Sequence, residues 1–177
     1  SVVNLVMDSR NVDVVGAENV TRLVGFRNCT VTAECPKLQK LALWGDILSE
    51  RNLPCPIRDV TTLSEMTVEA MTIDPAFQFP TQLTSLRLVV FNEWTHVACL
   101  TSLTRLRSLN IVAEKKSPID LSTLTTLTWL NTEVSPGLKL PTSLVQCTFS
   151  VQSDFDFSLL THLTSLHVFL EPNIRVT

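Results

Sequence analysis

The chain has 177 residues and a small formal net charge of −3, and its lysine and arginine residues are scattered along its length. This excludes a basic stripe of the kind that binds nucleic acid. With 45% hydrophobic and 18% charged residues, the composition is typical of a protein with a buried core and excludes a disordered chain. Apolar runs fall far short of the ~20 residues of a membrane-spanning helix, so no membrane insertion is expected.

A short apolar pattern recurs along the chain at a mean spacing of about 20 residues. The first copies are faint, and those that follow Pro36 are clear. Some copies enter through a proline, and others carry leucines at three-residue spacing, as in Leu100-x-x-Leu103-x-x-Leu106. Named by their first apolar residue, the copies begin at Val2, Leu23, Leu38, Leu63, Leu83, Leu106, Leu127, Leu144 and Leu163.

Each copy combines two spacings that predict different local structures. A Leu-x-Leu ending, as in Leu41-x-Leu43, has the two-residue period of a strand with one buried face. The three-residue leucine spacing before it is typical of a helical or 3₁₀ segment. Copies that follow Pro80 or Pro141 are expected to enter the strand from an extended connector. Stacked copies predict a parallel sheet in which every coil shares its core with its neighbours.

These copies resemble the leucine-rich repeat family, whose signature is L-x-x-L-x-L-x-x-N/C-x-L. The resemblance implies an α/β solenoid with a parallel β-sheet on the concave face and short 3₁₀, helical or extended segments on the convex face. It also implies that residues 1–177 form a single domain of about nine short repeats. Neither end carries a polar cap, so the domain is expected to belong to a longer chain or to be covered by a neighbouring chain or domain.

The asparagine or cysteine position of the family departs from the signature in this chain. In place of a ladder of asparagine side chains it holds Asp46, Met71, Phe91, Glu114, Ser135, Gln152 and Glu171. This departure leaves the tightness of the turns and the register open. A bundle of amphipathic helices also fits part of the pattern, but the Leu-x-Leu endings and the many threonines disfavour it. A parallel β-helix is disfavoured by the steady leucine spacing and by only four glycines.

The sequence contains no recognised catalytic or phosphate-binding motif, so we expect no enzyme, no cofactor and no metal site. Its five cysteines lack disulfide or zinc spacing, and buried free thiols favour a cytoplasmic over an extracellular location. Two glycosylation sequons, at Asn19 and Asn28, point the other way. Asp154 and Asp156 could share one side of an extended stretch, but no further oxygen ligands follow, which favours a solvated loop.

The side chains between the core positions are expected to line the concave sheet. Large aromatic residues and arginine among polar residues are typical of a protein-binding hot spot. In the alternative interpretation, both Trp44 and Trp129 fill the core. The candidate partner-binding residues are Trp44, Glu65, Arg87, Asn110, Trp129, Asn131, His167 and Phe169.

The sequence therefore predicts a non-enzymatic protein-binding scaffold, which recognises a protein partner through its concave or flanking surface. A second hypothesis is a structural subunit buried in a large multi-protein assembly, and the apolar composition and uncapped ends support it. A β-helical enzyme that acts on polysaccharides is the third. It requires carboxylates clustered on one strand face, and the sequence does not contain such a cluster.

Overall fold

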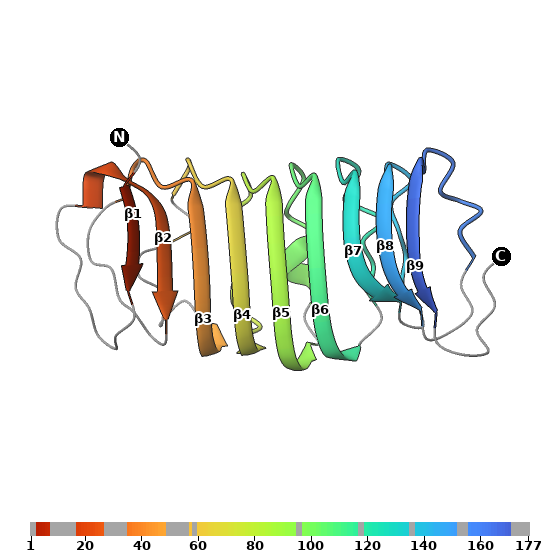
Figure 1. Ribbon diagram of the computed structural model, residues 1–177, viewed down its shortest axis with the longest axis horizontal. Coiled ribbons are helices and arrows are strands. Elements are labelled where there is room, and N and C mark those ends of the chain that lie inside the picture. Colours follow the sequence, from red (N-terminus) through yellow and green to blue (C-terminus); the bar gives the residue numbers. More distant parts are fainter. Residues whose placement is uncertain are drawn as a thin grey trace.

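The computed structural model describes residues 3–7, 17–26, 35–48, 57, 60–94, 97–116, 119–134, 137–151 and 156–170, which form a solenoid of parallel coils. Within these ranges nine strands make one sheet, and each strand pairs in parallel with the next along the chain. They stand side by side in sequence order (Figure 1). Their bounds are β1 Val3–Met7, β2 Val20–Phe26, β3 Lys40–Leu48, β4 Glu65–Ile73, β5 Ser85–Trp94, β6 Ser108–Lys116, β7 Trp129–Val134, β8 Gln146–Val151 and β9 Ser165–Leu170.

The Leu-x-Leu endings build the buried side of the sheet, as their two-residue period predicts. One column of buried side chains crosses β3–β7 in register and is at most 2% exposed: Leu41, Met66, Leu86, Leu109 and Leu130. A second buried column lies two residues further along the strands: Leu43, Val68, Leu88, Ile111, Thr132 and Phe149. Because each coil packs its leucines against the next coil, one hydrophobic core runs along the solenoid.

The coils contain almost no helix, so the α/β description is not confirmed. The described ranges hold no α-helix, and their helical residues are 3₁₀: the segments η1 (Ala17–Asn19) and η4 (Val97–Leu100), and Ile57. The three-residue leucine spacing instead forms consecutive hydrogen-bonded turns. The Leu103 amide donates to the Leu100 carbonyl at 2.9 Å, and the Leu106 amide donates to the Leu103 carbonyl at 3.0 Å.

These turns explain why leucine returns at every third residue. Each turn closes a bond between residues i and i+3, so side chains three positions apart point to the same side. Leu121, Leu124 and Leu127 repeat the arrangement and are at most 1% exposed, whereas the threonines between them are exposed. Threonine has a low helix propensity and favours the turn over continuation into an α-helix.

A ladder of carbonyl groups joins successive coils just before their strands. The Arg107 carbonyl accepts the N–H groups of Thr128 and Trp129, each at 3.0 Å, and the Thr128 hydroxyl at 3.2 Å. Serine and threonine therefore supply a third donor where the backbone supplies two. The same bond from a hydroxyl to a carbonyl of the preceding coil is made by Ser64, Thr84 and Thr164.

A second ladder uses the side chain that precedes the first leucine in four of the repeat copies. The Thr126 hydroxyl lies 2.8 Å from the Leu106 carbonyl oxygen in the coil before it. These bonds satisfy carbonyl groups of the turns that precede the strands. Comparable bonds to the preceding coil are made by Thr62, Ser143 and, through its amide nitrogen, Gln82.

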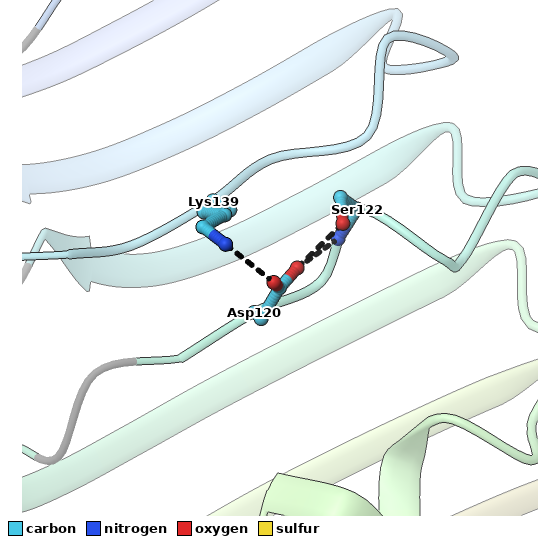
Figure 2. Close-up of polar contacts among 3 residues, drawn as sticks. All are labelled: Asp120, Ser122 and Lys139. Carbon is cyan, nitrogen blue, oxygen red and sulfur yellow. Dashed lines mark hydrogen bonds and ion pairs between the residues drawn. The ribbon is translucent and has the colours of Figure 1, made fainter.

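Asp120 joins two coils on the side of the solenoid away from the sheet. Its carboxylate accepts the Ser122 hydroxyl at 2.5 Å, the Lys139 ammonium at 3.0 Å and the Ser122 N–H at 3.0 Å (Figure 2). Asp120 and Lys139 also form an isolated parallel bridge. The hydrogen bonds from Ser122, and then that from Lys139, lower the pKa of Asp120 to about 2. The ionised carboxylate therefore fixes the start of one coil against the next.

Replacing Thr126 with valine keeps the shape of the side chain and removes the hydroxyl that bonds to the Leu106 carbonyl. We expect the free energy of unfolding to fall by about 1 kcal/mol, measured by urea unfolding. The matched control is Thr125→Val, because Thr125 is exposed and its side chain has no hydrogen bond with the described residues. The control should change by less than about 0.5 kcal/mol. An equal loss of unfolding free energy in the two variants would contradict a stabilising role for the Thr126 hydroxyl bond.

The Asp120 contribution to stability depends on pH. Since folding lowers its pKa from 3.8 to about 2, the contribution is complete above the unfolded-state value and is lost as the pH falls through the folded-state value. We expect Asp120→Asn to lower the melting temperature at neutral pH. The gap between wild type and variant should shrink as the pH falls from about 5 to about 2, measured by circular dichroism. A gap that stays constant over this range would oppose the prediction.

Candidate interaction surface

The outward side chains of the nine strands form a surface that we call the open face. They alternate with the buried side chains, and strand pairing aligns them in columns across the sheet, as the sequence predicts. The first column contains Lys40, Glu65, Ser85, Ser108, Trp129, Gln146 and Ser165. The second contains Ala42, Thr67, Arg87, Asn110, Asn131, Thr148 and His167. The third contains Trp44, Glu69, Val89 and Val112 on β3–β6, and Glu133, Ser150 and Phe169 on β7–β9.

The structure brings four of the candidate binding residues together near the middle of the sheet. Arg87, Asn110 and Asn131 are neighbours in the second column, on β5, β6 and β7. The Asn131 amide donates to the Asn110 side-chain oxygen at 3.4 Å. Trp129 lies two residues before Asn131 on the same face of β7. These residues therefore present one exposed cation, two amides and an aromatic ring on a common surface.

The other four candidates lie apart from this group. Trp44 is on β3, and Glu65 is on β4, where it forms an ion pair with Lys40 at 2.8 Å. His167 and Phe169 are both exposed on β9. At ~4.8 Å per strand, the candidates span roughly 29 Å from β3 to β9, which is a broad surface and not a compact pocket.

Both tryptophans lie on the open face, so the alternative that they fill the core is wrong. Trp44 follows the buried Leu43 on β3, and Trp129 precedes the buried Leu130 on β7. Each tryptophan is half-buried. Since side chains alternate along a strand, both rings point away from the core and form part of the surface.

A group of apolar side chains on β3–β6 forms what we call the apolar patch, and sequence reasoning named its member Trp44 but missed Met71 and Phe91. The group extends along the open face because β3–β6 have nine or ten residues, whereas β7–β9 have six. Its most exposed members are Met71 and Phe91, each 41% exposed, and Val112, 40% exposed. The patch consists of Trp44, Met71, Val89, Phe91 and Val112.

The patch has a signal in the sequence, which is the two-residue period continued past the third column. From Val89 the next outward residue on β5 is Phe91, and from Glu69 the next on β4 is Met71. Matching the chain to the family signature assigned Met71 and Phe91 to a turn position. Both instead lie on strands, on the open face.

The described thiols are not activated. Cys35 and Cys147 are buried and Cys99 is half-buried, and all three carry thiol groups. Burial raises the pKa of the Cys147 thiol to about 12 and of the Cys99 thiol to about 11, and it also raises the pKa of Cys35. Thiols with such pKa values are poor nucleophiles near neutral pH. Cys29 and Cys55 lie outside the described residues.

The carboxylate pair proposed near the last strand is only partly described. Asp154 lies outside the described residues, and Asp156 accepts the Ser158 N–H at 2.8 Å. Hydrogen bonds from Ser158 lower the pKa of Asp156, which therefore has a structural partner at the start of its turn. In the described part of the chain, no three His, Cys, Asp or Glu side chains are grouped closely enough to hold a metal ion.

Comparison with known proteins adds no family to this description. No protein-family model matches the sequence, and no curated protein matches it. Among the described residues there is no helix with the length and apolar character needed to cross a membrane.

We expect Cys147 and Cys35 to resist alkylation by iodoacetamide in the folded protein at about pH 8, because both are buried and their thiolates are suppressed. The same residues should react fully in urea, and peptide mass mapping would follow each one. Rapid modification of Cys147 in the folded protein, at the rate of an unfolded control, would contradict the burial described above.

Proposed function

We propose that this protein is a non-enzymatic, protein-binding solenoid of the leucine-rich repeat type, and that it recognises its partner on the open face. The apolar patch carries this proposal. Met71, Phe91 and Val112 are each about two-fifths exposed on one continuous sheet. Contiguous apolar side chains on a folded surface mark sites of protein interaction, because their exposure to water is unfavourable.

The surroundings of the patch favour a protein as the partner. Arg87 and the half-buried Trp129 lie on the same face, and arginine and tryptophan are enriched in the energetic centres of protein interfaces. The columns carry both charge signs, with Lys40 and Arg87 beside Glu65 and Glu69. These columns contain no stripe of one charge sign, which a polyanion would require. They also contain no repeated row of polar side chains of the kind that binds carbohydrate.

The rigidity of the sheet supports the same function. Each coil is joined to the next by backbone hydrogen bonds and by serine or threonine hydroxyls, so the outward side chains are held at fixed spacing. A binding surface that is already ordered loses less entropy on association. The hydrogen bonds between coils therefore favour binding by ordering the surface in advance, although they do not contact the partner.

Partner capture by purified variants tests the proposal. We expect the double variant Met71→Ser/Phe91→Ser to bind the partner captured from a native extract at least about tenfold more weakly than wild type. The matched control is Leu159→Ser, which removes a 75% exposed leucine from a turn outside the sheet. Circular dichroism and urea unfolding would establish that both variants fold. Unchanged capture by the folded double variant would overturn the proposal.

A second candidate function is that of a structural subunit inside a larger assembly. The exposed apolar side chains at β9 support it. At β9 the core column is less covered, since Leu166 is 39% exposed whereas Leu130 is 0% and Cys147 is 2% exposed. Leu159, which is 75% exposed, lies in the turn before this strand, and Phe169, which is 66% exposed, lies in the strand. The same two variants separate the functions, because a subunit interface at this end requires Leu159→Ser, and not the patch variant, to abolish association.

A further inference from the structure

We infer that the open face across β3–β5 binds a polypeptide segment in which a lysine or arginine is flanked by apolar side chains, with the cation placed on Glu69. This inference rests on the proposed function and specifies the chemistry of the partner. It depends on the difference between two glutamates on β4, one of which has a partner in the folded chain and one of which does not.

Glu69 lies inside the apolar patch. Strand pairing sets it between Trp44 on β3 and Val89 on β5, and Met71 follows it on the same face of β4. Its side chain is half-buried, and it forms no hydrogen bond or ion pair with the described residues. Three of the four nearest outward neighbours of this carboxylate are therefore apolar, and the fourth is Thr67.

Glu65 provides the internal comparison. It lies two positions before Thr67 and four before Glu69, on the same strand and the same face. Its column neighbour on β3 is Lys40, whose ammonium lies 2.8 Å from the Glu65 carboxylate. The corresponding neighbour of Glu69 is Trp44. The chain thus neutralises one carboxylate and leaves the other for a cation from outside.

A partner that covers the patch must remove water from Glu69. Burying a carboxylate without a counter-charge or hydrogen bond is strongly unfavourable, so a purely apolar partner is disfavoured. A lysine or arginine restores a charge-assisted hydrogen bond, and the Trp44 ring beside it attracts the same cation. Apolar side chains on either side of that cation would then cover Phe91 and Met71.

Arg87 narrows the choice of partner further. It is exposed on β5, where it pairs with Thr67, two residues before Glu69 on β4. It makes no ion pair with the described residues. A second basic residue in the bound segment would be repelled at this point, since like charges across an interface cost binding energy. The favoured segment therefore carries one basic residue over Glu69, and not a basic run.

Selection of random dodecapeptides displayed on phage against the purified wild-type chain tests the inference. We expect enriched sequences with one lysine or arginine between large apolar residues. A synthetic peptide of the enriched sequence should bind Glu69→Gln about tenfold more weakly than wild type, measured by isothermal titration calorimetry. The matched control is Glu18→Gln, which removes the same charge from an exposed glutamate in η1, outside the sheet. Its affinity should change by less than about twofold.

Two results would overturn the inference. One is an absence of enriched peptides, or an enriched sequence without a basic residue. The other is equal weakening by Glu69→Gln and Glu18→Gln. If Met71→Ser/Phe91→Ser still weakens capture of the native partner in either case, the proposed function stands and the role of Glu69 fails. Self-association of wild type that Phe91→Ser abolishes would assign the patch to a second copy of the chain and would also overturn the inference.

Discussion

The hydrogen bonds between successive coils are the constraint on which the rest of the structure depends. A carbonyl just before each of the strands β3–β8 accepts two N–H groups from the next coil. In four cases it also accepts a hydroxyl, from Ser64, Thr84, Thr128 or Thr164. This arrangement holds neighbouring strands at the ~4.8 Å spacing of a β-sheet. No coil is large enough to bury its own leucines, so burial of Leu109 and Leu130 requires that their coils stay in register. The core and the open face both follow from that stacking.

The strands of this fold could be predicted because their signal is local. The two-residue period in Leu86-x-Leu88 and Leu109-x-Ile111 reports which side chains are buried, and the structure places these residues in the expected columns. The outer segments were harder, since leucine at every third residue fits a 3₁₀ helix and a series of turns equally well. The threonines between the leucines decide in favour of turns, as at Thr125 and Thr126.

The hydroxyl ladders were beyond what the sequence alone could predict. The bond from Thr126 to Leu106 joins residues 20 positions apart, and recognising it requires the register between two coils. Once that register is known, the frequent serine and threonine residues acquire a role, because they satisfy carbonyl groups that the turns leave open. Hydroxyl groups that precede the strands therefore contribute to the contacts between coils.

The candidate surface could be predicted in part for the same reason. Outward residues such as Arg87 and Asn110 follow directly from the strand period, and so does their alignment in one column. The extent of the surface does not follow, because it depends on where each strand ends. Strands β4 and β5 continue beyond the third column, and this places Met71 and Phe91 on the open face instead of in a turn.

The two glutamates of β4 show how a fixed register turns a sequence into a charge pattern. Lys40 and Trp44 are four residues apart on β3, as are Glu65 and Glu69 on β4. Strand pairing therefore places Glu65 beside Lys40 and Glu69 beside Trp44. An unpaired carboxylate that still contacts water costs the folded chain little. The cost arises only when a partner covers it. Glu69 therefore has its main effect at the binding step, where it penalises partners that bring no cation.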